Sequence, residues 1–503
     1  MPHKFWKLPL RMALAPLGLI LAALVAQPAE ARWFRAETPN FIFYSESSAE
    51  ETREKAETLE KFDQLLRMFT AVEEEWNGPK FRVFEVDSAS DVSRRFHGLA
   101  AGVYYGSLRG AFAVVPRKQV GFHRIGLDPQ EVLFHEYTHH YMLQYFPGSY
   151  PAWYTEGFAE FFATVRFLPD GKVEIGYPQQ RHVPFLTEPG DWIDYEDLMN
   201  GRVGATYMAY AQGWLLVHFA SFNQPAREAI AAYLEAMRDG ADAEQAYEQE
   251  IATLDWSLHG AVRRYYRNDE VPVRTAEIEF EPVGEIEVRE LSEREADIAL
   301  VYGRIGNAYG GTVRSVADDY SDDPQAQAEL AHFLIADRDY DNAIEAGRRA
   351  VELDSDHVEG NAMLGAALVL AALESGDAGD ARWAEGRAFL LRSNRLDPYY
   401  PPALYYYYRS FPPAAAKPEN AIAALEQAYR FMPQNYEART ALAIEFLGQS
   451  RFDLARLMIL PVINSLHHDY YELFAERVFE QIEARNSDIG GLLADIGELD
   501  KPW

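Results

Sequence analysis

Two histidines four residues apart, with a glutamate between them, are the residues of this chain best suited to chemistry. His135, Glu136 and His139 form an HExxH pattern within the stretch EVLFHEYTHHYMLQYF. Residues four apart lie on one face of a helix, so both imidazoles can point at one metal ion. Zinc takes nitrogen ligands at about 2.0–2.1 Å in roughly tetrahedral sites. Glu136 would lie beside the metal and take a proton from a water molecule held there.

A third metal ligand is expected on a second helix, because a catalytic zinc has three protein ligands and one open position. The Pro-Gly pair at 147–148 would end the first helix, and Pro151 would begin another. Glu156 lies on this second helix, seventeen residues after His139, and is the candidate ligand. Glu160, one turn further, could hydrogen-bond the free N–H of a ligand histidine. The alternative is a surface helix with two unrelated histidines.

The stretches HEYTHH and PAWYTEGFAEFF resemble the gluzincin metallopeptidases. They are most similar to the peptidase-MA-like families of exported bacterial proteins and more distantly similar to aminopeptidase N. The resemblance implies one zinc ion per chain, held by His135, His139 and the glutamate of the W-x-x-E-G motif, here Glu156. It also implies a tyrosine that stabilises the oxyanion. The stretch AYAQGWLLVHF is similar to the P-Y-E-K-G stretch that carries this tyrosine, and Tyr210 takes its position.

The role of Tyr210 has a simpler alternative. A phenol O–H is a suitable donor to a developing oxyanion. A tyrosine at the start of a core helix can also be a packed aromatic with no catalytic role. Tyr207 is the reserve candidate for the oxyanion donor.

The strand before the zinc helix departs from the aminopeptidase pattern. Aminopeptidases carry G-x-M-E-N on an edge strand there, where it binds the substrate backbone and its free amine. The corresponding stretch here is RGAFAVVPRK, which lacks the amine-binding glutamate. Residues 110–115 could still add a strand to an extended peptide, or could form an ordinary sheet strand. The missing glutamate argues against a simple aminopeptidase.

Together with the surrounding patterns, the resemblance implies the fold class: an α+β gluzincin-like metallopeptidase domain followed by an all-α solenoid that resembles tetratricopeptide repeats. Residues 32–268 are expected to form the first domain. Its small mixed sheet and its helical subdomain are predicted from alternating and helical periodicity, with strands at 40–44, 80–86, 103–105 and 110–115, and helices at 45–69, 88–96, 205–222, 226–237 and 251–266. Residues 269–290 alternate Val, Ile and Glu, which predicts a short β-hairpin or an extended connection.

Residues 291–485 resemble tetratricopeptide repeats, whose period is about 34 residues. Ala421 and Ala455 lie one period apart, and each begins a helical stretch with a small residue. Residues 486–503 form a tail. The repeats are expected to be an arm that binds a protein or peptide, or alternatively a passive spacer. The tyrosines at 399–400 and 405–408 are either an aromatic contact surface or helix packing.

The composition and the N-terminal segment limit the kinds of partner and the cellular compartment that we expect for this protein. The net charge of −31 disfavours nucleic acid and anionic membranes as partners. The chain has no cysteine, so disulfides and Cys-ligated zinc are excluded. Residues 1–31 are typical of a secretory signal peptide cleaved after Ala31 or after Ala26. The protein is therefore expected to be periplasmic or secreted, with no membrane span after cleavage; the alternative is an uncleaved signal anchor.

Two functions of different classes fit these patterns. The first is an exported zinc metallopeptidase that hydrolyses peptide bonds with a metal-activated water, using a peptide or protein as substrate and the repeats as a binding arm. The second is a non-catalytic peptide-binding scaffold with a vestigial peptidase domain.

Overall fold

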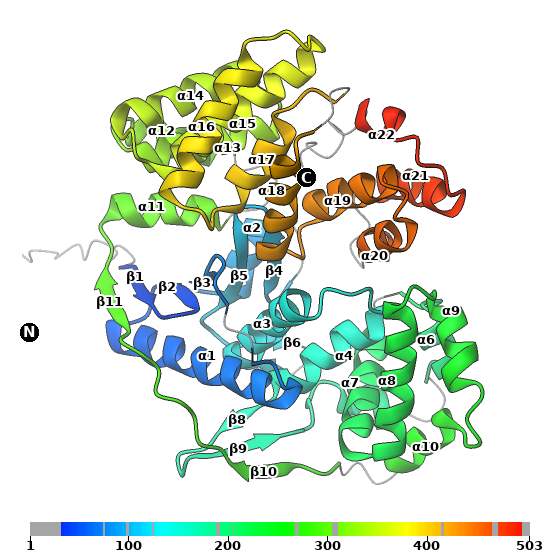
Figure 1. Ribbon diagram of the computed structural model, residues 1–503. Helices are drawn as coiled ribbons and strands as arrows, with labels where there is room; N and C mark the ends of the chain where they lie inside the picture. Colours follow the sequence, from blue (N-terminus) through cyan, green and yellow to red (C-terminus); the bar gives the residue numbers. More distant parts are fainter. Residues whose placement is uncertain are drawn as a thin grey trace, which may run out of the picture.

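The computed structural model describes residues 32–73, 76–96, 100–122, 125–187, 192–204, 206–266, 271–303, 310–413, 417–464 and 471–494. The predicted signal peptide lies outside these residues. Figure 1 shows an α/β half, with a group of helices beside it, and an array of helices above the sheet.

A six-stranded mixed sheet forms the centre of the α/β half, in the order β11-β1-β2-β3-β5-β4. The β2–β3 and β3–β5 pairs are parallel and the other pairs are antiparallel. Its strands are β1 (Phe34–Glu37), β2 (Phe41–Ser45), β3 (Phe81–Val86), β4 (Val103–Ser107), β5 (Gly110–Pro116) and β11 (Glu287–Glu290). Two smaller sheets contain β6 (Val120–Phe122) and β7 (Ile125–Leu127), and β8 (Arg166–Phe167), β9 (Lys172–Ile175) and β10 (Arg274–Glu277). The predicted mixed sheet is confirmed.

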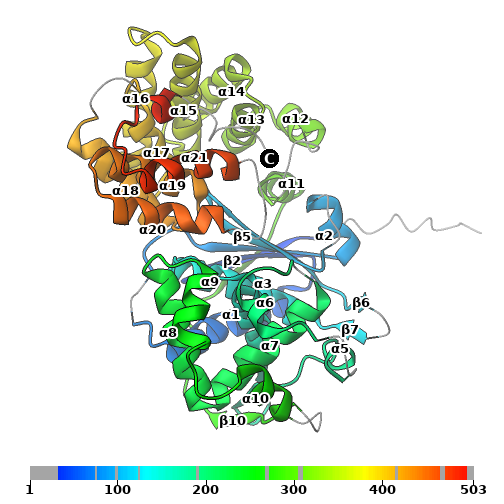
Figure 2. The ribbon, with the colours of Figure 1, turned by 90° about the vertical axis from the view of Figure 1, so that its right-hand side faces the viewer.

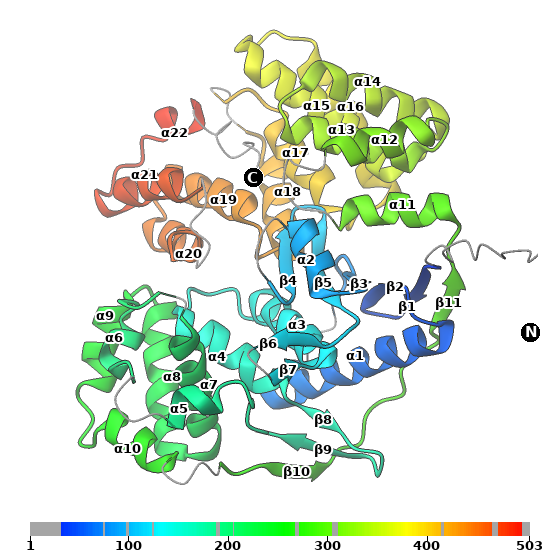
Figure 3. The same cartoon turned by 180° about the vertical axis from the view of Figure 1, so that it is seen from behind.

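Helices cover both faces of the large sheet. One face packs against α1 (Ala49–Thr70) and α3 (Pro129–Tyr145), through residues such as Phe43 and Phe134. The other face packs against α2 (Ala89–Phe96) and α11 (Glu293–Tyr302), through residues such as Phe84 and Val114. Figure 3 shows α2 and α11 between the sheet and the helical array. The sheet is therefore an inner layer, which explains why β5 is buried at every position.

Residues 110–115, considered either as a strand that receives the substrate or as an ordinary sheet strand, do not lie at an edge of the sheet. β5 pairs with β3 on one side and with β4 on the other, so its backbone groups on both sides are already used. The expectation that this strand binds an extended peptide is therefore wrong. Residues 103–107 fold back on β5 as a hairpin and become the edge strand, β4.

The helical subdomain lies beside the sheet (Figure 1). It contains α4 (Ala152–Ala163), α5 (Val183–Thr187), α6 (Tyr195–Met199), α7 (Tyr207–Phe222), α8 (Gln224–Arg238), α9 (Ala243–Ala246), the π-helix η1 (Tyr247–Ile251) and α10 (Leu258–Tyr265). The segment 269–290 returns from this subdomain to the sheet. Its strand β10 pairs with β9 and its strand β11 pairs with β1, so within the described residues it is not a hairpin but adds one strand to each of two sheets.

The predicted all-α array is confirmed. Its helices are α12 (Gly310–Asp319), α13 (Pro324–Ala336), α14 (Tyr340–Leu353), α15 (Val358–Ser375), α16 (Arg382–Leu396), α17 (Pro401–Arg409), α18 (Glu419–Phe431), α19 (Tyr436–Gly448), α20 (Phe452–Ile463), α21 (Tyr471–Glu483) and α22 (Gly490–Ala494). From α12 to α21 each helix contacts the next, and α13, α15 and α17 also contact one another in turn, as in a solenoid. Figure 2 shows this array stacked over the sheet.

Two features of the array concern its surface. Tyr400, Tyr405 and Tyr408 are buried, while Tyr399 is 51% exposed. The aromatic contact surface considered at 399–400 and 405–408 is therefore mostly helix packing. Among the described residues, α15 alone is long and apolar enough to cross a membrane, and 72% of that stretch is buried by the neighbouring parts of the chain.

The array and the α/β half share one hydrophobic core. Tyr137 of α3, Leu404 of α17, Leu425 of α18 and Phe474 of α21 belong to the same continuous cluster. The part of the helical array from α17 on is therefore packed against the domain that carries the HExxH helix.

Candidate metal centre

The helix α3 begins just before the HExxH pattern. Asp128 caps it by accepting a hydrogen bond from the Gln130 N–H, and Pro129 occupies the first turn. His135 and His139 point to the same side, with side chains 14% and 12% exposed. They are therefore sheltered but accessible from solvent.

The second ligand helix, α4, contacts α7 almost backbone to backbone. A Cβ added at Gly157 would collide with the carbonyl group of Gly213, so these two glycines permit the close approach. Glu156 directly precedes Gly157, and Tyr210 lies one turn before Gly213. The helix crossing therefore brings the candidate ligand Glu156 and the candidate oxyanion donor Tyr210 toward the same place.

The three predicted ligands converge. His135 Nε2 and His139 Nε2 lie 3.0 Å apart. Glu156 Oε2 lies 3.4 Å from His135 Nε2 and 3.6 Å from His139 Nε2. Ligands at about 2.0–2.1 Å in a tetrahedral zinc site are about 3.3 Å from one another. The three atoms thus form one face of such a tetrahedron, and the fourth position is free of protein ligands among the described residues.

The donor set also fits a cation chemically. Glu156 Oε2 is buried and has no hydrogen-bond partner among the described residues. Burial alone would raise the pKa of Glu156, but the two histidines outweigh it and lower that pKa well below its usual range. A buried carboxylate kept ionised beside two imidazole nitrogens is a suitable ligand set for zinc. His135, His139 and Glu156 can therefore hold a metal ion together.

Glu160 lies behind His135 and is completely buried. Its Oε1 lies 3.6 Å from His135 Nδ1, and its Oε2 lies 3.2 Å from His182 Nε2. Arg181 donates a hydrogen bond to the same carboxylate. Burial opposes ionisation of Glu160, but Arg181 and His182 outweigh it and hold its pKa well below the usual range. Glu160 is therefore an anion that can orient the His135 ring.

The neighbouring carboxylates also change the pKa of His135. Burial would lower the pKa of His135, but Glu156, Glu160 and Glu136 outweigh burial and raise it to about 9. A metal ion binding here takes the place of that proton.

Glu136 lies between the metal ligands and the edge strand β4. It is buried, and burial is the main cause of its raised pKa. A Cβ added at Gly102 would lie 2.9 Å from Glu136 Oε1 and would collide with Val132 Cγ1. The backbone of Tyr104 hydrogen-bonds to the Glu136 carboxylate. The candidate base is therefore in contact with the start of the edge strand.

Tyr210 lies in the electrostatic field of this site. Burial raises its pKa well above the ordinary value, and Glu156, Glu160 and Glu136 raise it further, in that order. Its phenol is therefore protonated and able to donate at neutral pH. The reserve candidate Tyr207 is 55% exposed, and its ring stacks on Phe185, 5.8 Å between centroids.

Some residues of the site were not found by sequence reasoning. Arg181 and His182 lie in a loop that could line a cleft, but the sequence does not show which residues it faces, and only the fold brings them to Glu160. Gly102 could not be assigned because its importance comes from the space that Glu136 occupies beside it. Such residues are recognisable only when the elements they face are known.

The comparisons with known proteins concern the helical array. No protein-family model matches the chain, and no curated protein matches it. Solved structures similar to it include a thermophilic TPR protein of Thermus thermophilus, with 20% identity, a TM-score of 0.31, and coverage of 38% of this chain and 99% of that one. PilF of Pseudomonas aeruginosa has 18% identity and a TM-score of 0.28, with coverage of 40% of this chain and 89% of that one. These TM-scores are too low to carry an argument. The description of the array as a solenoid therefore rests on the contacts between its own helices.

Proposed function

We propose that this chain is an exported zinc-dependent metallopeptidase of the gluzincin type, with one zinc ion per chain. The observation that carries the proposal is the triangle of His135 Nε2, His139 Nε2 and Glu156 Oε2, with sides of 3.0, 3.4 and 3.6 Å. A buried glutamate beside such a triangle is the arrangement that metal-assisted hydrolysis needs.

Each residue has a proposed role. Zinc, when held by the three ligands, would supply Lewis-acid chemistry, polarising the substrate carbonyl and lowering the pKa of water. Glu136 takes a proton from the attacking water and passes it to the leaving amine; its burial, which raises the pKa of its carboxyl group, favours both roles. Tyr210, protonated at neutral pH, donates to the oxyanion that forms on the substrate carbonyl.

The substrate is proposed to be an extended peptide lying along β4. This strand is paired on one side only among the described strands, and it begins in contact with Glu136. A peptide added antiparallel to β4 would bring its carbonyls past the metal ligands, with main-chain hydrogen bonds supplying affinity. The helical array, which resembles tetratricopeptide repeats, is proposed to bind a protein or peptide partner.

The test is a comparison of the wild-type chain with Glu136→Gln. Both are loaded with zinc and incubated with a diverse peptide library, and products are read by mass spectrometry. Under the proposal both bind one zinc per chain, and Glu136→Gln loses at least about 10³-fold in cleavage rate because the general base and proton donor is removed. The positions of the cuts separate internal from end-directed cleavage.

Two results would count against the proposal. Zinc binding with no cleavage by the wild type would favour the peptide-binding scaffold. Equal cleavage by both proteins would point to a contaminating protease. Export is tested separately, by sequencing the N-terminus of the protein recovered from the periplasm or medium, where Arg32 or Gln27 is expected at the start.

A further inference from the structure

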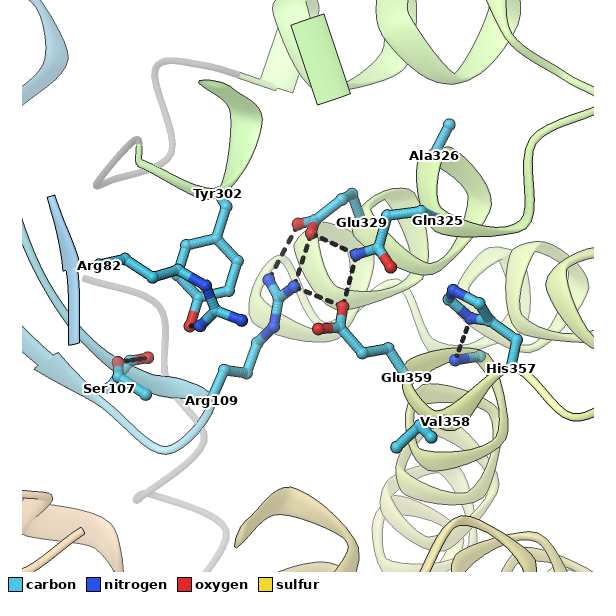
Figure 4. Close-up of polar contacts among 12 residues, drawn as sticks. Arg82, Ser107, Arg109, Tyr302, Gln325, Ala326, Glu329, His357, Val358 and Glu359 are labelled. Atoms are coloured by element: carbon cyan, nitrogen blue, oxygen red, sulfur yellow. Dashed lines mark hydrogen bonds and ion pairs between the residues drawn. The ribbon is translucent and has the colours of Figure 1, made fainter. Parts of the chain in front are cut away.

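The turn of the β4–β5 hairpin enters the helical array. Arg109 lies in the turn between Ser107 and Gly110, and its side chain is 6% exposed. Its guanidinium donates two parallel hydrogen bonds to Glu329 of α13, at 2.9 and 2.6 Å, and one to Glu359 of α15, at 2.9 Å. Figure 4 shows Arg109 extending from the hairpin between these two carboxylates.

The surroundings of Arg109 are organised to hold this cation. Gln325 donates to both carboxylates, at 2.9 Å to Glu329 and 2.6 Å to Glu359, and so fixes their separation. The ring of Tyr302 lies under the guanidinium, 4.5 Å from its carbon to the ring centroid. The hydroxyl of Tyr302 accepts a hydrogen bond from Arg82 of β3 at 2.6 Å. Two arginines thus balance two sheltered glutamates, and the bidentate contact restricts the turn to one position.

A second contact holds the same strand. A Cβ added at Gly106 of β4 would lie 2.6 Å from Gln434 Cγ, in the segment between α18 and α19. The hydroxyl of Tyr104 lies beside the same position, 3.1 Å from the added Cβ. The end of β4 is therefore in direct contact with two separate parts of the helical array.

The other end of β4 touches the candidate base. There is no space for a Cβ at Gly102, because Glu136 and Val132 occupy the position that it would take. Strand residues advance about 3.3 Å each, so Gly102 and the Arg109 turn are roughly 20 Å apart along one short, stiff hairpin. One hairpin thus connects the Arg109 contacts to the strand beside Glu136.

We propose that Arg109 is a positioning residue of the catalytic centre, through which the helical array fixes β4 against Glu136 and the bound peptide. This inference rests on the proposed function for its catalytic consequence, but the fixing of β4 is measurable without any activity. The array is then a structural part of the site as well as a binding arm.

The experiment uses the zinc-loaded chain and three measurements: backbone amide exchange in residues 102–107, zinc content, and kcat/KM for a peptide that the wild type cleaves. Arg109→Met is expected to increase exchange in residues 102–107 at least about tenfold and to lower kcat/KM by about 10- to 100-fold, with one zinc per chain retained. Arg109→Lys keeps the charge but loses the bidentate contact, and gives an intermediate effect. The matched control is Arg348→Met, which breaks the ion pair with Glu385 on the outer surface of the same array and leaves all three measurements unchanged.

A second set of variants applies if Arg109→Met fails to fold. Gly106→Ala adds a Cβ against Gln434 and is expected to reproduce the increased exchange. Gly106→Ala combined with Gln434→Ala removes the collision and restores the wild-type values. Unchanged exchange in residues 102–107 in both Arg109→Met and Gly106→Ala would overturn the inference. A wild type without activity would overturn the proposed function alone, because the exchange results would still decide whether the array fixes β4.

Discussion

At the scale of single residues, the candidate metal centre depends on a carboxylate that does not touch the metal position. Glu160 is fully buried, lies 3.6 Å from His135 Nδ1, and is held by Arg181 and His182. A partner of this kind fixes the ring orientation and the tautomer of a ligand histidine. It also explains why the loop at 181–182 lies against α4.

Replacing Glu160 by Gln tests this role. The amide cannot act as an anion toward His135, so the variant is expected to bind zinc about 10- to 100-fold more weakly while keeping its three ligands. Zinc affinity is measured by competition with a chelating dye near neutral pH. Glu174→Gln on β9 is the control, since Glu174 is not among the residues that converge on the site. Equal affinities of the wild type and Glu160→Gln would contradict the role.

At the scale of elements, the sequence predicts what is local and misses what depends on pairing. The two ligand helices are predictable because the Pro-Gly pair at 147–148, Pro151 and the HExxH pattern lie within a few residues of the features they determine. The edge strand is not predictable, because whether residues 103–107 or 110–115 end the sheet depends on which strand meets β3. The same holds for β11, whose partner β1 lies about 250 residues earlier in the chain.

The helix α7, which carries Tyr210, is held by a buried neutral histidine. His218 donates from Nε2 to the Gly176 carbonyl at 3.0 Å and accepts at Nδ1 from the Tyr265 hydroxyl at 2.8 Å. Burial lowers its pKa to about 4. Because the unfolded chain binds this proton near pH 6.5, the contribution to stability is complete above about pH 6.5 and is lost as the pH falls toward 4.

Because of His218 alone, we expect the free energy of unfolding to be about 2 kcal/mol lower at about pH 5 than at about pH 7.5. Urea unfolding at the two pH values measures it. His218→Gln removes this group and should show a smaller pH dependence by about that amount; His140 and His332, whose pKa values burial also lowers, to about 3 each, stay in both proteins and cancel. An unchanged pH dependence in the variant would show that His218 is not the titrating group.

At the scale of the whole molecule, the second half of the array holds the connection between the two ligand helices. Arg439 of α19 is 1% exposed and donates to the carbonyl of Pro147 at 3.0 Å, as well as to those of Pro433 at 2.7 Å and Met458 at 3.2 Å. Asn464 donates to Ser149 Oγ at 2.8 Å in the same connection. Residues about 300 positions later in the chain thus hold the segment between His139 and Glu156 in place. No local sequence pattern reveals these contacts.

Arg439→Met is therefore expected to affect both halves together. The variant removes the hydrogen bonds that Arg439 donates to three carbonyls, so we expect a loss of about 2–4 kcal/mol in the free energy of unfolding and weaker zinc binding, since the connection between α3 and α4 is released. Urea unfolding and zinc competition measure the two effects. Arg392→Met, which removes an exposed ion pair with Asp356 on the same array, should change stability by no more than about 0.5 kcal/mol and leave zinc affinity unaltered. A destabilised Arg439→Met that binds zinc as tightly as the wild type would mean that the array stabilises the fold without shaping the metal centre.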